Sequence, residues 1–276
     1  MMNKEIKQRL ASNWFKLLQN IICKDIEKIE KNKIRFRSTT WQRNKTKDEG
    51  GGEFRILKNG KIFDKVGVNF SEVHGKFSNE IKKKIPGANI NPNFWASGIS
   101  IVMHMQNPHI PAIHFNTRFI YTTHGWFGGG MDVTPCLKDN NEKKYLHKEL
   151  KTMCDRHDKT YYKNYKEWCD KYFFIPHRKE MRGIGGIFFD YKKQNWEKDF
   201  NFVRDLGVSF QMIFNSIIDK KYKKKWTVKD KELQYIKRGR YAEFNLLYDR
   251  GTKFGLQTGG NVEGILMSLP PLAKWN

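Results

Sequence analysis

The sequence predicts an α+β fold, a single domain over residues 1–276 built around an antiparallel sheet. Three observations predict this class. A long segment near the N-terminus has apolar residues at helical spacing, two pairs of alternating apolar segments follow, and helical segments then precede two short segments with strand-like alternation. With 276 residues and 38% hydrophobic residues, the chain can bury a substantial core.

The first predicted element is an N-terminal helix over residues 4–32. Its apolar residues recur every three or four positions, as on one face of an amphipathic helix. They are Ile6, Leu10, Trp14, Leu17, Leu18, Ile21, Ile22 and Ile26. We expect this helix to serve packing and not function.

A β-hairpin is predicted next. Three glycines at residues 50–52 precede alternating apolar residues, and the turn Asn59-Gly60 leads to a second strand over residues 62–70. The glycines lack the spacing of a phosphate-binding loop and precede a strand, so they indicate a flexible turn.

A second hairpin is predicted over residues 98–121, around the segment Asn-Pro-His-Ile-Pro at 107–111, whose prolines cannot continue a central strand. A loop symmetric about His109 would pair residues whose numbers sum to 218. These pairs are His104 with His114, Val102 with Asn116, and Ser100 with Arg118, all on one face. The opposite face would be core, with Ile99, Ile101, Met103, Ile113, Phe115 and Phe119.

The polar face of this hairpin is a candidate site. Directly opposed side chains have Cβ atoms roughly 5 Å apart, so two imidazoles there can share a metal ion, a water or a carboxylate ligand. Arg118 adds a guanidinium suited to carboxylates. The alternative is a solvent-exposed sheet face with incidental polar residues.

Helices are predicted over residues 143–154, 160–173 and about 195–218, and short strands over 239–248 and 253–257. The basic segment 175–183 runs into glycines at 185–186, and it either binds carboxylates or is an ordinary connection. Asp249 and Arg250 precede Gly251, where an acid and a base can reach one ligand if the turn breaks the strand alternation. A surface turn is the alternative.

The net charge is +23, from 52 Lys and Arg against 29 Asp and Glu. One local cluster of lysines contains Lys220, Lys221, Lys223, Lys224 and Lys225. Such a charge fits a solvated surface, the steering of an acidic small substrate, or nucleic-acid binding.

No apolar run reaches the ~20 residues of a membrane helix, and charged residues interrupt the N-terminus early. We therefore expect a cytoplasmic protein without stable membrane insertion. The four cysteines, Cys23, Cys136, Cys154 and Cys169, lie far apart and predict free thiols in a reducing compartment.

Four stretches of the chain resemble the oxygen-dependent coproporphyrinogen-III oxidase family. They are Gly-Gly-Glu-Phe-Arg-Ile-Leu at 51–57 continuing through Val-His-Gly at 73–75, residues 100–118, residues 168–190, and residues 238–271. With fitting spacing between them, they cover about residues 50–271.

The resemblance implies a large, flat antiparallel β-sheet flanked by helices on both faces, and a homodimer. The implied enzyme oxidatively decarboxylates two propionate groups of coproporphyrinogen III to vinyl groups, giving protoporphyrinogen IX, CO2 and H2O2 in haem biosynthesis. Dioxygen would be the co-substrate, and the chemistry would require no metal or organic cofactor.

The resemblance also implies residue roles. His114 falls at the position assigned proton transfer, and Asp249 and Arg250 fall at the catalytic centre. The implied substrate-binding residues are Ser100, Asn116, Thr117, Arg118, Gly259, Gly260 and Asn261. His104, His114, His147 and His177 match histidines proposed to hold a divalent metal. At Asn261 many family members carry arginine, so this chain lacks a charge there.

Two other functions remain open from the residues alone. A metal-dependent oxygenase would use His104 and His114 with a carboxylate from Glu243 or Asp249. A basic nucleic-acid-binding protein is supported by the charge, although the chain contains no recognisable binding motif.

Overall fold

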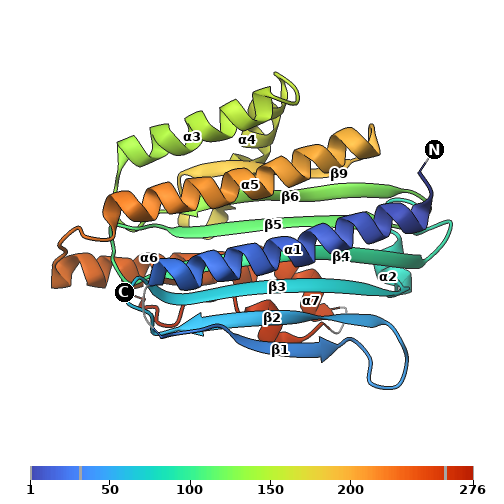
Figure 1. Ribbon diagram of the computed structural model, residues 1–276, viewed down its shortest axis with the longest axis horizontal. Helices are drawn as coiled ribbons and strands as arrows, with labels where there is room; N and C mark the ends of the chain where they lie inside the picture. The colour runs from blue at the N-terminus through green and yellow to red at the C-terminus, as the bar shows by residue number, and fades with distance from the viewer. Residues whose placement is uncertain (1, 31–32, 258–259, 276) are drawn as a thin grey trace.

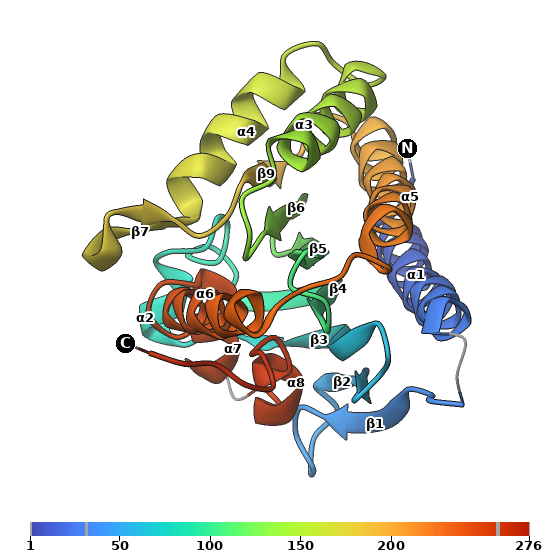
Figure 2. The same cartoon turned by 90° about the vertical axis from the view of Figure 1, so that its left-hand side faces the viewer.

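The computed structural model describes residues 2–30, 33–257 and 260–275. A seven-stranded antiparallel sheet runs through the molecule in the order β1-β2-β3-β4-β5-β6-β9. The sheet is antiparallel, as the sequence predicts, and helices lie on both of its faces (Figure 2), as the family resemblance implies.

The strands of the sheet are β1 (Arg37–Gln42), β2 (Gly50–Lys58), β3 (Phe63–Lys76), β4 (Asn93–Met105), β5 (Ala112–Tyr121), β6 (Gly125–Thr134) and β9 (Gly185–Lys192). The helices are α1 (Lys4–Glu30), α2 (Asn79–Lys82), α3 (Asn140–Asp155), α4 (Tyr161–Tyr172), α5 (Trp196–Lys221), α6 (Val228–Leu247), α7 (Arg250–Gln257) and α8 (Val262–Leu266). Two short strands, β7 (Phe174–Ile175) and β8 (Glu180–Met181), form a separate hairpin.

One face of the sheet carries the main hydrophobic core. Helices α1, α3 and α5 cover this face, and α6, α7 and α8 lie on the other (Figures 1 and 2). Phe15 and Ile22 of α1 and Phe210 of α5 are buried against strand residues such as Ile101 and Phe115. The predicted N-terminal helix is confirmed over Lys4–Glu30, and its last predicted residues, 31 and 32, lie outside the described residues. The three predicted helices over 143–218 are also confirmed.

The first predicted hairpin is confirmed as β2–β3, but the prediction of a flexible turn at the glycines of residues 50–52 is wrong, because they begin β2 and pair with β3. Asn59 adopts the left-handed conformation that the tight turn requires, with φ of 58°. The Glu30 carboxylate at the end of α1 accepts hydrogen bonds from the main-chain N–H groups of Lys61, Ile62 and Phe63, at 2.8, 2.8 and 2.6 Å. This carboxylate therefore ties the helix to the turn.

The second predicted hairpin is also confirmed, but its register differs from the predicted one. Ser100 lies opposite Asn116, and Val102 opposite His114. The connecting turn is centred on residues 107–110, where the N–H of Ile110 donates to the carbonyl of Asn107 at 3.0 Å, and not on His109. A shift of two residues keeps every side chain on its predicted face.

The strands predicted over 239–248 and 253–257 are wrong, because both segments are helical in α6 and α7. Helix α6 begins at Val228 with a capping box between Thr227 and Asp230. Its buried positions recur at helical spacing, but several of them are polar. They are Gln234, Arg238, Gly239, Tyr241, Ala242, Phe244 and Asn245. The sequence of α6 therefore largely lacks the apolar stripe that would have indicated an amphipathic helix.

The four cysteines are all free, as predicted, and all are buried. Burial raises the pKa of the Cys23 and Cys154 thiols to about 12 and that of Cys136 to about 11. They are therefore protonated at neutral pH and poor nucleophiles.

Within the described ranges, no helix combines the length and the apolar composition needed to cross a membrane.

Candidate functional site

The polar face of β4 and β5 lies opposite the main core, on the side of the sheet that α6, α7 and α8 cover. Ser100, Asn116 and Arg118 are all partly exposed on this face. Register places them in neighbouring rows, because Asn116 pairs with Ser100 on one side and Gly130 on the other, and Gly130 pairs with Phe188 of β9. The structure thus brings three of the predicted site residues together.

His114 is held by a chain of polar groups across the sheet. Its Nδ1 lies 2.8 Å from Asp132 Oδ1, and Asn116 Nδ2 lies 3.1 Å from its Nε2. Because a carboxylate can only accept and an amide NH2 can only donate, these contacts fit a neutral imidazole with the proton on Nδ1. The Nε2 lone pair therefore accepts from Asn116, a predicted substrate-binding residue.

Asp132 is itself paired with Arg182, a residue of the basic segment 175–183. Both side chains are buried, and the other carboxylate oxygen of Asp132 accepts from Arg182 Nη2. Burial alone would raise the pKa of Asp132, but Arg182 and His114 outweigh it and hold this pKa below its ordinary value. The carboxylate is therefore charged, and it fixes the orientation of His114.

Aromatic rings and an amide accommodate the buried guanidinium of Arg182. It lies over the Phe173 ring at 3.9 Å, the Tyr241 ring at 4.7 Å and the Phe244 ring at 4.8 Å. Its Nη1 donates to Asn245 Oδ1 at 3.1 Å. Because Tyr241, Phe244 and Asn245 belong to α6, this arginine joins the helix to the floor of the site.

Arg118 forms an ion pair with Asp190 at the end of β9, with Nη2 and Oδ2 separated by 2.7 Å. The pair passes above Gly128 of β6. A Cβ atom at Gly128 would lie 2.5 Å from Asp190 Oδ1 and 2.9 Å from Arg118 Nη2. Glycine at this position therefore allows the ion pair to form, while a third of the Arg118 side chain stays exposed, at 33%.

Asp249 and Arg250 lie at the junction of α6 and α7, where Asp249 caps the start of α7. Asp249 Oδ2 accepts from the N–H of Thr252 at 2.6 Å, and Oδ1 accepts from the Tyr172 hydroxyl at 2.8 Å. The Tyr172 ring stacks on Phe188, with centroids 4.4 Å apart. The Arg250 guanidinium lies over the Tyr172 ring at 5.1 Å.

The stack of Tyr172 on Phe188 connects the Asp249–Arg250 pair to the polar face of β4 and β5. Phe188 lies in the same row of the sheet as Asn116, two residues before Asp190, the partner of Arg118. Asp249 and Arg250 therefore lie beside the polar face of the β4–β5 hairpin. More than a hundred residues of sequence separate this pair from the hairpin.

The remaining predicted substrate-binding residues occupy different positions. The Thr117 side chain is buried, on the opposite side of β5 from Asn116 and Arg118, so only its main chain borders the polar face. Asn261 caps α8, with Oδ1 accepting from the N–H of Gly264 at 2.9 Å, and the N–H of Gly260 donates to Gly255. Gly259 lies outside the described residues.

The four histidines predicted to hold a metal do not converge. Two of them donate from Nε2 to main-chain carbonyls, His104 to Ser268 and His147 to Ile184, both at 2.9 Å. Burial lowers the pKa of His104 to about 3 and also lowers the pKa of His147. Over the residues that the structure describes, no three His, Cys, Asp or Glu side chains are placed to hold a metal ion.

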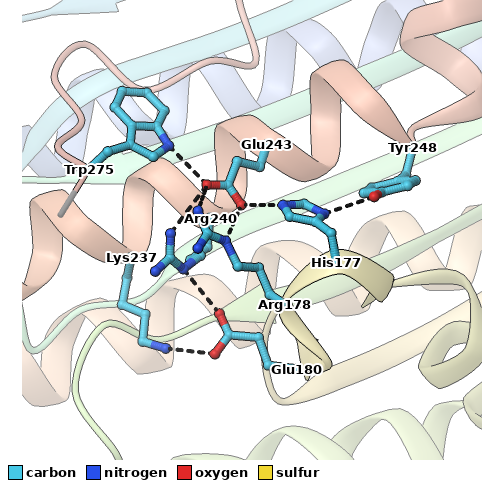
Figure 3. Close-up of polar contacts among 8 residues, drawn as sticks. All are labelled: His177, Arg178, Glu180, Lys237, Arg240, Glu243, Tyr248 and Trp275. Atoms are coloured by element: carbon cyan, nitrogen blue, oxygen red, sulfur yellow. Dashed lines mark hydrogen bonds and ion pairs between the residues drawn. The ribbon is translucent and has the colours of Figure 1, made fainter.

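His177 belongs to a separate polar cluster around Glu243 (Figure 3). Glu243 accepts from His177 Nε2 at 2.8 Å, Arg178 Nη2 at 2.6 Å and Trp275 Nε1 at 2.9 Å. Hydrogen bonds from Arg178 above all hold the pKa of Glu243 at about 2. This cluster fastens the C-terminal segment to α6 and to the β7–β8 hairpin. It also engages Glu243, one of the two carboxylates that the metal-dependent alternative could use.

Sequence reasoning missed three residues of the site, Asp132, Tyr172 and Asp190. Asp132 is an acidic residue inside an otherwise apolar strand segment, a pattern that indicates a paired buried charge. No comparable signal marks Tyr172 or Asp190, because their importance depends on partners far away in the sequence.

Comparison with known proteins identifies close relatives. The family model described as Coproporphyrinogen III oxidase matches residues 11–276. A protein of Rickettsia akari named oxygen-dependent coproporphyrinogen-III oxidase is 50% identical over 99% of both chains. Proteins of the same name from Rickettsia africae and Rickettsia bellii are 49% and 47% identical, each over at least 99% of both chains.

Proposed function

Because the chain belongs to the coproporphyrinogen III oxidase family, we propose that it is the oxygen-dependent oxidase that converts coproporphyrinogen III to protoporphyrinogen IX in haem biosynthesis. The observation that carries this proposal is a pair of solvent-accessible arginines, the partly exposed Arg118 and the exposed Arg250, on the side of the sheet that also carries the Asp249 carboxylate. A substrate with four propionates requires such cations.

Arg118 and Arg250 are proposed to hold propionates, with Ser100 and Asn116 as neutral hydrogen-bond partners. Arg118 shares its charge with Asp190, so its guanidinium is already oriented before a substrate carboxylate arrives. The main chain near Thr117, Gly259 and Gly260 is proposed to line the same site. Asn261 is proposed to contribute through its cap of α8 and not through charge.

The proposed chemistry uses the electron-rich pyrrole of the substrate to react with dioxygen. Asp249 orients or accepts the proton of a pyrrole N–H, which favours addition of dioxygen to the ring. The peroxide so formed removes a hydrogen from the propionate β-carbon. Loss of CO2 leaves the electron pair as a vinyl double bond, and the peroxide departs with a further proton as H2O2. Each vinyl group thus consumes one dioxygen.

His114 is proposed to transfer a proton at Nε2, because Asp132 holds the proton on Nδ1. No step of this scheme passes through a metal or an organic cofactor. The placement of His104, His147 and His177 gives no support to a shared metal site.

We further propose that the enzyme works as a homodimer in the cytoplasm. Apolar side chains on the C-terminal helices remain exposed, which fits a surface that a second copy covers. They include Leu246 at 49%, Leu247 at 50%, Phe254 at 39%, Leu256 at 42% and Val262 at 53% exposure.

The direct test is turnover by metal-free protein. The protein is mixed anaerobically with coproporphyrinogen III, air is admitted, and the product is oxidised and followed by fluorescence. We expect the divinyl product and H2O2 without added metal. Activity that returns only with added metal would assign the chemistry to the histidines, and no turnover under either condition would overturn the proposed function.

Replacing Gly128 with alanine tests the role of Arg118. The added methyl would displace the Arg118 and Asp190 side chains, so we expect KM to rise about 10-fold with kcat changed less than about 2-fold. Asp190→Asn, which keeps the shape but removes the charge, is expected to raise KM in the same direction. Steady-state kinetics check both, with thermal melting as the control for folding. A fall in kcat at constant KM would contradict a binding role.

A further inference from the structure

The connection between α5 and α6 forms an exposed cationic tip at one end of the molecule, at the left in Figure 1. The tip consists of Lys223, Lys224, Lys225, Trp226 and Val228, followed by Lys229. The lysines are exposed, and Trp226 and Val228 have 45% and 78% of their surface exposed. None of these residues takes part in the proposed reaction.

The main chain of the tip is held firmly against the β4–β5 turn. Asn107 Nδ2 donates to the carbonyls of Lys221 and Lys224 at 3.3 and 2.7 Å, and a ring nitrogen of His109 lies 3.1 Å from the carbonyl of Lys225. Since these carbonyls face inward, the lysine side chains are directed to solvent. The capping box of Thr227 and Asp230 fixes the chain where α6 begins.

Four lysines of the tip lack a close carboxylate partner among the described residues. Lys221 is buried and paired with Asp139 and Glu142, so it serves the fold. In the described part of the chain, Lys223, Lys224, Lys225 and Lys229 form no ion pair with Asp or Glu. The tip thus combines four exposed lysines without an ion pair with one exposed indole ring and one exposed aliphatic side chain.

We propose that this tip docks the protein onto an anionic lipid surface. Lysines next to a bilayer are attracted by its negative surface potential, and tryptophan prefers the interface between headgroups and acyl chains. Val228 would enter the same boundary region. A single-stranded nucleic acid is instead bound along an extended basic groove with several stacking rings, whereas this tip offers one ring.

Docking would give the reaction a place to release its product. This reason for docking rests on the proposed function, whereas lipid binding itself does not. The conversion replaces two of four propionates by vinyl groups, so the product is less charged and more apolar than the substrate. Helix α6 carries the tip at its first residue and Asp249 just past its last, so one rigid element connects the bilayer to the site.

The test is flotation of the whole protein with vesicles of phosphatidylcholine, with and without phosphatidylglycerol. We expect binding only to the anionic vesicles, weakened by salt. The triple variant Lys223→Gln, Lys224→Gln, Lys225→Gln is expected to bind about 100-fold more weakly, because each lysine contributes roughly a fivefold step. Trp226→Ala is expected to weaken binding about 10-fold.

A matched control removes the same charge elsewhere. Lys82, Lys83 and Lys84 are also consecutive, at α2 on another part of the surface, with no tryptophan beside them. Changing all three to glutamine is expected to leave vesicle binding within about 2-fold of the original. Turnover in solution is expected to stay unchanged in the tip variant, because the tip contains no site residue.

Several results would overturn the docking proposal. Equal weakening by both triple variants would assign binding to the overall charge. Equal affinity for neutral and anionic vesicles would remove the electrostatic basis. Loss of affinity for a single-stranded RNA homopolymer in the tip variant, with vesicle binding intact, would make the tip a nucleic-acid site. Because vesicle binding is measured without substrate, its failure is separate from a failure of the proposed function.

Discussion

Replacing Arg182 with methionine is expected to lower the free energy of unfolding by about 3–5 kcal/mol, because the charge of Asp132 would remain buried without its partner. The two side chains are 1% and 2% exposed, so water cannot replace the lost guanidinium. For a chain of this size the melting temperature is expected to fall by roughly 10 °C. Chemical denaturation and calorimetry measure both quantities.

The loss of unfolding free energy in Arg182→Met should depend on pH in a defined direction. In the native protein the pKa of Asp132 lies below its ordinary value, so the pair stabilises the fold above the unfolded pKa of about 4, and this contribution is lost as pH falls through the folded pKa. Without Arg182, burial raises the pKa, and a protonated Asp132 is tolerated. The original protein and Arg182→Met are therefore expected to differ less in free energy of unfolding as pH falls from 7 toward about 4.

Arg178→Met is the matched control. Arg178 also pairs with a carboxylate, but its partner Glu243 keeps donors from His177, Arg240 and Trp275. Because Arg178 is exposed, we expect a loss of less than about 1 kcal/mol. Equal losses in the two variants would show that burial of the Asp132 pair is not what stabilises this part of the fold.

The sequence predicts the elements whose apolar residues face the main core. Helix α1 and the strands of both hairpins follow the expected periods, because their apolar residues pack together with those of α5 in the main core. The even shift in the register of β4–β5 kept every residue on its predicted face, so the candidate site survived an error in pairing.

Prediction of secondary structure from the sequence failed where a helix covers the polar face of the sheet. Helix α6 buries Gln234 and Arg238, both of which donate to the carbonyl of Met105, so its inward face lacks an apolar stripe. The short alternation at residues 243–246 then favoured a strand. The same cause hides part of the site, because Asp132, Asp190 and Tyr172 acquire their partners only through tertiary contacts.

Asp249→Asn is expected to lower kcat by about 10²–10⁴, the range that loss of a positioned acid–base group produces. The substitution isolates the charge from the fold. Asparagine caps a helix about as well as aspartate, so the contact with the N–H of Thr252 and the start of α7 should be retained. We therefore expect a change in the free energy of unfolding below about 1 kcal/mol.

Tyr172→Phe separates the position of the carboxylate from its chemistry. It removes the hydroxyl that donates to Asp249 at 2.8 Å and accepts from the N–H of Arg250 at 3.0 Å, but keeps the ring that stacks on Phe188. A kcat about 10-fold lower with little change in KM is expected, because Asp249 keeps its charge but loses its orientation. Tyr165→Phe, on the same helix but packed against Phe189 and Phe202, is the control and should leave kcat unchanged.

The two variants are informative together. If Asp249 acts through its carboxylate and Tyr172 only orients it, adding Tyr172→Phe to Asp249→Asn should lower kcat by much less than the tenfold effect it has alone. Independent, additive losses would instead mean that the tyrosine contacts the substrate directly. Near-normal kcat in Asp249→Asn, with the protein folded and the substrate bound, would remove Asp249 from the chemistry and leave His114, held by Asp132, as the proton-transferring group.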